Sequence, residues 1–247
     1  MKIILQSKLK ANGQIQTDHF SQRSFIVIFK PNNHRKWFSI AYVVVFFLLE
    51  IMIVTNNSVI LGFDHSIQNM LGTIVSPANT KIFSAITFLG SPIMDVIYLV
   101  IIMMLLFKQG RKSASLWTGF ILVGGNIISY LVKITVRRPR PSGKIIPASG
   151  YSFPSGHVFG TTLVILALII LVLPYLKKTS TNHLIKALLI IWLIIVAISR
   201  VYLHGHYPSD VIGSALLAGA WWECGELLYI RYHDTLVNKF HLETNSD

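Results

Sequence analysis

Charged residues are scarce in this sequence. Asp, Glu, Lys and Arg make up 13% of its 247 residues, whereas hydrophobic residues make up 53% and the mean hydropathy is +0.59. A soluble domain typically carries about 25% charged residues. The apolar residues also come in runs long enough to cross a bilayer, which takes about 20 residues per helix. The composition therefore excludes an ordinary soluble domain and predicts an all-α, polytopic membrane protein.

Cysteine is almost absent, and a secretory signal is not recognisable. Cys224 is the single cysteine, which excludes an intramolecular disulfide and a thiolate metal cluster. A thiol phosphatase would need an arginine after five residues, but six separate Cys224 from Arg231. The first residues lack the apolar core and the cleavage site of a signal peptide, so we expect the first hydrophobic span to remain as an anchor.

Six hydrophobic stretches are candidate membrane spans: 38–61, 92–107, 115–136, 157–176, 184–203 and 209–230. They predict a six-transmembrane-helix bundle, a membrane domain over 38–232 between a basic tail at 1–37 and a C-terminal tail at 233–247. In the first long connection, 62–91, the pattern FDHSIQNML predicts an amphipathic helix lying on the outer membrane surface. Small residues in the last span indicate close helix packing, namely Gly213, Ala215, Ala218 and Gly219.

Basic residues gather on one side of this layout. If six helices alternate, the N-terminal tail and the connections after the second and fourth spans share a side, and they hold Lys2, Lys8, Lys10, Arg23, Lys30, Arg35, Lys36, Lys108, Arg111, Lys112, Lys177 and Lys178. The positive-inside rule assigns that side to the cytoplasm. We therefore expect a multi-pass plasma-membrane protein with both termini in the cytoplasm.

A net charge of +12 also raises the question of nucleic-acid binding. Membrane topology explains most of this charge, so we expect no nucleic-acid partner. The connection between the third and fourth spans is the exception, because it faces outside yet holds Arg137, Arg138, Arg140 and Lys144. Positive charge where the topology disfavours it points to an anionic ligand.

Three polar clusters fall on this same outer side. They are KITVRRPRP at 133–141, YSFPSGH at 151–157 and SRVYLHGHYPSD at 199–210. Lys133, Arg140 and Arg200 would supply cationic donors, and guanidinium groups suit phosphate oxygens. A helix bundle that brings the clusters together would form a phosphate site.

The second and third clusters add helix starts and two histidines. Ser155 is suited to cap a helix, and Gly156 lets a ligand approach the free amides there, which favour an anion. Asp210 follows His206 by four residues, a spacing that lets a carboxylate hold the imidazole and support a charge on it. With His157, the site would have a nucleophile and a general acid, but these residues alone leave open which histidine attacks.

These blocks resemble the signature of the type 2 phosphatidic acid phosphatase superfamily of membrane lipid phosphatases. The matching positions are Lys133 and, six residues on, Arg140-Pro141; then Pro154-Ser155-Gly156-His157; then Ser199-Arg200, His206 and Asp210. The resemblance implies that His206 forms a phosphohistidine, that His157 is the general acid and base, and that Asp210 orients His206. It implies that the phosphoryl oxygens are bound by Lys133, Arg140, Ser155, Gly156 and Arg200, without a metal or cofactor.

The substrate implied by the resemblance is a phosphorylated lipid whose tail stays in the bilayer, processed at the outer interface. Among bacterial members, which this compact chain resembles, undecaprenyl diphosphate is the favoured substrate, with phosphatidylglycerophosphate or phosphatidate as alternatives. A phosphotransferase, in which a second lipid replaces water, stays open. So does a transporter that binds phosphate without chemistry.

A metal site is the rival interpretation of the polar clusters, with ligands drawn from His157, His204, His206 and Asp210. Three nearby cations would repel a divalent ion, so we expect no metal. The other basic residues of the third connection, Arg137, Arg138 and Lys144, are expected to contact lipid headgroups rather than to catalyse.

Overall fold

The structure is a computed structural model that describes residue 29 and residues 33–175 and 179–240. Every regular element in this part of the chain is helical, which confirms the all-α prediction. The helices are α2 (Asn33–Val54), α3 (Ser58–Gly72), α4 (Pro77–Leu89), α5 (Pro92–Lys108), α6 (Lys112–Val136), α7 (Gly156–Ala167), α8 (Thr179–Tyr202) and α9 (Pro208–Phe240). A π-helical turn, η1 (Leu168–Val172), and a 3-10 turn, η2 (Leu173–Tyr175), prolong α7.

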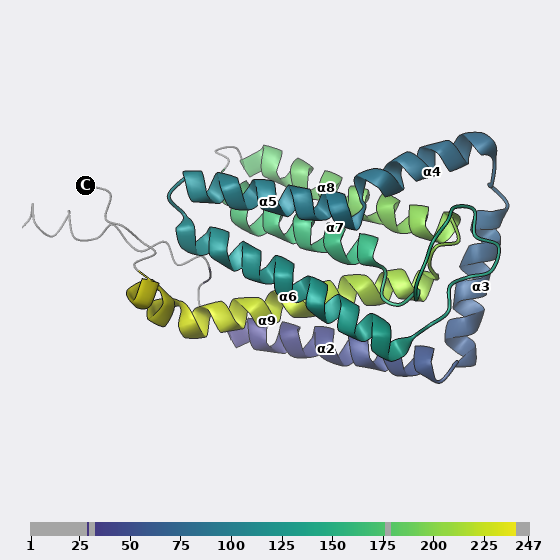
Figure 1. Cartoon of the computed structure of the whole chain (residues 1–247), viewed down its shortest axis with the longest axis horizontal. Helices are drawn as coiled ribbons and strands as arrows, with labels where there is room; N and C mark the ends of the chain where they lie inside the picture. Colours follow the sequence, from purple (N-terminus) through teal and green to yellow (C-terminus); the bar gives the residue numbers. More distant parts are fainter. Residues whose placement is uncertain (1–28, 30–32, 176–178, 241–247) are drawn as a thin grey trace, which may run out of the picture.

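The long helices form one bundle. Helices α2, α5, α6, α7, α8 and α9 run lengthwise, and successive ones point in opposite directions (Figure 1). At one end α3 lies across the bundle, next to α4 and the connection 137–155. The start of α2 and the end of α9 lie at the opposite end. The three polar clusters predicted to share one side therefore do share one end of the bundle.

Hydropathy supports fewer membrane spans than expected. Among the described residues, four helical stretches are long and apolar enough to cross a bilayer, namely Lys36–Val54, Lys112–Val136, Gly156–Tyr175 and Thr181–Tyr202. The pair α4 and α5, bent by 40°, would make a fifth if it forms one span. Helix α9 is not among them, although its 33 residues are long enough. A multi-pass membrane protein is supported, and the count of six stays a prediction.

One expected boundary is wrong. The first span ends at Val54 rather than at 61, because Asn56 adopts a left-handed conformation with φ 51° and Asn57 caps the next helix. The connection 62–91 is correspondingly filled by α3 and α4. Helix α9 runs through 232 to Phe240, and the end of the membrane domain at 232 stays a prediction.

Several expected features lie outside the described residues. These are most of the basic tail at 1–37, the lysines at 177 and 178, and residues 241–247.

The predicted FDHSIQNML helix is present as part of α3, and its two faces differ. Asp64 and Gln68 point into the protein and are buried, whereas Val59, Phe63 and Met70 are exposed. An outward apolar face is what an interfacial helix presents to lipid. Its position on a membrane surface stays a prediction.

Helix α9 packs against α2, α3, α6, α7 and α8. Its glycines permit this close approach. A Cβ at Gly213 would come within 2.4 Å of the Phe153 ring, and one at Gly219 within 2.9 Å of the Tyr42 ring. The close packing expected for these two residues is therefore confirmed. Because α9 is held in this way, its first turn stands in a fixed position at the polar end.

Apolar side chains cover the outward faces of the lengthwise helices, among them Phe47, Ile51, Ile101, Phe120 and Leu188. Charged side chains are instead buried at the polar end, where Arg138 and Asp210 are 9% and 0% exposed. Large exposed apolar surfaces mark contact with lipid or with other proteins. This distribution, with apolar side chains outside and charge inside, fits a lipid environment.

Candidate active site

Arg140 joins the first polar cluster to the third. Its Nη1 donates to the carbonyl oxygen of Gly205 at 2.6 Å and lies 3.1 Å from Nε2 of His206. Its Nη2 donates to the carbonyl oxygen of Ser149 at 2.8 Å, in the connection that leads to α7. The guanidinium is therefore fixed by backbone carbonyls, with one edge against a histidine.

Lys133 joins the first cluster to the second. It stands in the last turn of α6, and its Nζ donates to the carbonyl oxygens of Tyr151 and Pro154 at 3.0 and 2.7 Å. Just beyond it α6 ends at Val136, and the C-cap residue Arg137, in a left-handed conformation (φ 51°), turns the chain. This turn brings the 138–155 segment back over the helix ends, where the other two clusters lie.

The imidazole of His206 is oriented by a backbone carbonyl. Its Nδ1 lies 2.7 Å from the carbonyl oxygen of Ser152, which can only accept a hydrogen bond. Nδ1 must therefore carry the ring proton, and Nε2 is left with the lone pair. The Arg140 guanidinium beside Nε2 has only donors, which requires the same tautomer.

Asp210 stands in the first turn of α9, close to His206, as the spacing of the two residues predicted. Its Oδ2 lies 3.7 Å from Nδ1 of His206 and accepts from the amide of Tyr207 at 2.9 Å. The carboxylate is thus close enough to stabilise a positive ring, although the direct hydrogen bond of Nδ1 goes to Ser152. Burial lowers the pKa of His206 to about 4; Asp210 opposes this shift, while Arg200 and Arg140 add to it.

Several buried polar atoms of this end have no hydrogen-bond partner among the described residues. They include Nε2 of Gln68 and of His204 and, at two positions of the signature, Oγ of Ser155 and Nε of Arg200. Ser155 is the N-cap residue of α7, as predicted, but its hydroxyl does not cap the helix. Buried polar atoms without partners are rare in folded proteins and call for an explanation. A phosphoryl group bound here would give Oγ of Ser155 and Nε of Arg200 a hydrogen-bond partner.

Gly156 and His157 open helix α7 beside these groups. Gly156 is the first helical residue and its Cα faces Pro92, where an added Cβ would meet a ring carbon at 3.5 Å. His157 is half-buried in the first turn, within electrostatic range of Arg200, His206, Arg140 and Lys133. The structure therefore brings all eight predicted site residues to one end of the bundle.

Arg138 corrects one expectation, because it is not available to lipid headgroups. It is 9% exposed and pairs with two carboxylates, Asp64 of α3 and Asp210 of α9, each at 2.6 Å. Sequence reasoning missed Asp64 altogether. The only signal was an acidic residue inside the FDHSIQNML pattern, which predicted an amphipathic helix but no partner for Asp64. Arg137 is exposed and remains compatible with a headgroup contact.

His204 lies away from this arrangement. It adopts a left-handed conformation with φ 52°, and its Nδ1 lies 3.3 Å from the carbonyl oxygen of Ser142. It therefore lies against the 137–155 connection, in keeping with its lack of a matching position in the signature.

Comparison with known proteins places the chain in a family. The sequence profile of the PAP2 superfamily matches residues 114–229, which include all three polar clusters. Phosphatidylglycerophosphatase B of Bacillus subtilis (strain 168) is 31% identical over 176 residues, covering 68% of this chain and 83% of that protein. The chain belongs to the PAP2 superfamily. Undecaprenyl-diphosphatase BcrC of the same organism is 28% identical over 152 residues, covering 58% of this chain and 73% of the relative.

Solved structures share the PAP2 fold. The transmembrane PAP2-type phosphatidylglycerolphosphate phosphatase from Bacillus subtilis has a TM-score of 0.70 at 22% identity, covering 78% of this chain and 96% of that one. Aquifex aeolicus LpxE has a TM-score of 0.51 at 20% identity, covering 68% of this chain and 95% of that one. These two likenesses show a shared fold, and the sequence matches place the chain in the PAP2 lipid phosphatase family.

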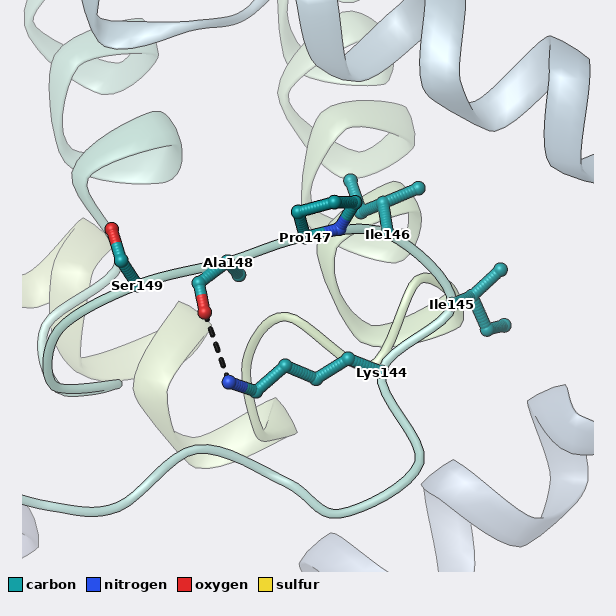
Figure 2. Close-up of a pocket in the computed structure, with 6 residues that line it drawn as sticks. All are labelled: Lys144, Ile145, Ile146, Pro147, Ala148 and Ser149. Atoms are coloured by element: carbon teal, nitrogen blue, oxygen red, sulfur yellow. Dashed lines mark hydrogen bonds between the residues drawn. The ribbon is translucent and has the colours of Figure 1, made fainter.

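A cavity of about 570 Å³ lies beside the PAP2 site, in the 137–155 connection. It is lined by residues 144–149, which Figure 2 draws as sticks. The Lys144 side chain reaches back across the loop, and its Nζ donates to the carbonyl oxygen of Ala148 at 2.9 Å (Figure 2). Ser149, at the other end of the lining, is the residue whose carbonyl accepts from Arg140. Cavity and site therefore share one loop.

Proposed function

We propose that this PAP2 protein hydrolyses a phosphorylated lipid through a phosphohistidine on His206. The favoured substrate is undecaprenyl diphosphate, and the lipid product is undecaprenyl phosphate. One observation carries the proposal: Nδ1 of His206 is tied to a carbonyl oxygen at 2.7 Å, so the lone pair of Nε2 is directed at the cationic edge of Arg140. A phosphoryl group drawn to that edge would meet a nucleophile.

In the first step, Nε2 of His206 attacks the terminal phosphorus. A P–N bond forms, the bond from phosphorus to the lipid-side oxygen breaks, and His157 gives a proton to that oxygen. The ring, which keeps its proton on Nδ1, becomes positive, and the carboxylate of Asp210 at 3.7 Å stabilises it. The lipid product then leaves into the bilayer.

In the second step, water replaces the lipid. His157, now neutral, takes a proton from water, whose oxygen attacks phosphorus. The P–N bond breaks, its electron pair returns to Nε2, and inorganic phosphate is released. The charge that develops on the phosphoryl oxygens is stabilised in both steps by Lys133, Arg140, Ser155, Gly156 and Arg200. The cationic groups among them take the charge-stabilising role that a metal ion has in metal-dependent phosphatases. Activity should therefore survive strong chelation.

The substrate assignment rests on the two named relatives, one of which is an undecaprenyl-diphosphatase and the other a phosphatidylglycerophosphatase. Phosphatidylglycerophosphate and phosphatidate are therefore the alternative substrates. A phosphotransferase would use the same first step and a lipid hydroxyl in the second. A phosphate-binding transporter would need the cations but not a histidine with a fixed tautomer, which favours the enzyme.

Phosphate release from purified protein in detergent tests this proposal. We expect kcat/KM to be highest for undecaprenyl diphosphate, lower for phosphatidylglycerophosphate and phosphatidate, and unchanged by EDTA. The His206→Ala variant, which lacks the proposed nucleophile, is the negative control for phosphate release. No release from any lipid by folded protein would favour the transporter, and loss of activity with EDTA that zinc or magnesium restores would favour a metal site.

A further inference from the structure

A buried charge network lies behind the site, and its outer member has no role so far. Asp64 of α3 is 0% exposed. Its Oδ2 accepts from Nη2 of Arg138 at 2.6 Å and from Oγ of Ser209 at 2.7 Å, and its Oδ1 accepts from the amide of Ser209 at 2.8 Å. These three hydrogen bonds are with Arg138 and Ser209, which both lie beside Asp210. Asp64 thus joins α3, outside the profile match at 114–229, to the start of α9.

Arg138 connects Asp64 to the catalytic carboxylate. Its Nη1 donates to Oδ1 of Asp210 at 2.6 Å and to Oγ of Ser209 at 2.8 Å. Its guanidinium lies over the Tyr207 ring, 4.1 Å from the centroid. Each of the two carboxylates therefore holds one side of the same guanidinium, and Asp210 has its remaining oxygen turned toward His206.

We propose that Asp64 is a positioning residue of the phosphatase reaction, which acts through Arg138 to leave one net negative charge behind His206. Two carboxylates share one guanidinium, so one negative charge is not neutralised. If Asp64 were neutral, Arg138 would neutralise Asp210 alone and nothing negative would face the ring. The phosphorylated ring carries a positive charge in this buried setting, where electrostatic interactions are strong. This inference rests on His206 as the proposed nucleophile.

The expected signature is a loss in kcat alone. Asp64→Asn keeps the shape and an acceptor for Arg138 but removes the extra negative charge. We expect kcat to fall about tenfold or more, which corresponds to a modest loss of transition-state stabilisation. KM should change little, since the contacts of Asp64 are all within the network. The matched control is Gln68→Leu, a buried polar residue one turn along α3, which should keep kcat within about twofold.

A second substitution separates this role from a structural one. In the double variant Asp64→Asn/Arg138→Gln, Asp210 again faces His206 with its negative charge unshared. We expect the double variant to recover most of the kcat that Asp64→Asn loses, although it has lost two native charges. A residue that served only the fold would give the opposite result, with the double variant worse than the single one.

Steady-state kinetics and thermal unfolding of detergent-purified protein decide the matter. An unchanged kcat in Asp64→Asn, a loss confined to KM, or a double variant no faster than the single would overturn the proposal. So would failure of both variants to fold, because Asp64 would then serve the fold. If only Asp64→Asn fails to fold, turnover by the double variant supports the proposal and its absence refutes it. An active His206→Ala variant would instead refute the proposed nucleophile, independently of Asp64.

Discussion

At the scale of the residue, the two ring nitrogens of His206 meet opposite surroundings. Nδ1 faces oxygen atoms, the carbonyl of Ser152 at 2.7 Å and the carboxylate of Asp210 at 3.7 Å. Nε2 faces the Arg140 guanidinium at 3.1 Å. The first side fixes the proton and favours a positive ring, and the second side attracts the phosphoryl group and keeps the resting ring neutral.

The acidic limb of kcat/KM should report this environment. With the pKa of His206 lowered to about 4, chiefly by burial, Nε2 is free to attack at any pH above that value. Charges that act on the ring are Asp210, Arg200, Arg140 and His157. Arg140→Gln removes one positive charge, which raises the pKa of His206, so the limb should move to higher pH while the rate falls overall.

Rates measured as a function of pH with one substrate isolate this shift, because the ionisation of the substrate is the same for each variant. Arg137→Gln, an exposed arginine three residues earlier, is the control and should leave the limb in place. A limb that stays put or moves to lower pH in Arg140→Gln would contradict the assignment.

Part of this residue-level account could be read from the sequence and part could not. The spacing of His206 and Asp210 predicted their proximity, since a residue in the first turn of a helix lies next to the loop before it. The contact of His206 with the carbonyl of Ser152 could not be predicted. Every residue has a backbone carbonyl, so the sequence does not show which one a distant side chain contacts. Arg138 was misjudged for a related reason: a basic residue in a loop shows its charge but not its burial.

At the scale of the element, the connection 137–155 does most to build the site. It carries Arg140, provides the carbonyls that hold Lys133 and His206, and lines the open pocket beside Lys144. Lys144 is exposed, and its Nζ is within reach of the cavity it lines. We interpret it as the headgroup contact of this loop.

Lys144→Gln should therefore weaken substrate capture and leave the chemistry intact. We expect KM for an anionic lipid substrate to rise about three- to tenfold with kcat nearly unchanged, as for a lost exposed charge contact. The control is Lys81→Gln, an exposed lysine of α4. Kinetics on mixed micelles would check this, and a fall in kcat at constant KM would show that Lys144 belongs to the catalytic machinery instead.

At the scale of the whole molecule, alternation of the lengthwise helices places the site at one end of the bundle, and the start of α2 and the end of α9 at the other (Figure 1). Hydrophobic runs predicted this alternation well, since each helix of the bundle contains one of them. They failed at 55–91, where α3 and α4 follow a short turn. Local apolarity does not reveal where a turn such as that at Asn56 ends one helix and begins the next.

The basic bias of the sequence predicts that the site faces outside. Cysteines placed singly at Ser142 and Ser180, in a Cys224→Ser background, probe the two ends of the bundle in intact cells with an impermeant thiol reagent. We expect labelling at 142, in the loop that builds the site, and none at 180, at the start of α8. Labelling at 180 and not at 142 would reverse the assigned orientation.

The central claim is a covalent phosphohistidine on His206. The direct measurement is rapid quenching of the enzyme at alkaline pH during turnover of a lipid diphosphate, followed by peptide mass spectrometry. The account predicts a phosphoryl group on the peptide that holds His206, stable in base and lost in acid, and absent from His206→Ala, which should be folded and inactive. The His204→Asn variant, altered two residues earlier, should retain both the modification and turnover. Turnover by His206→Ala, or a phosphoryl group found on His157 instead, would contradict it.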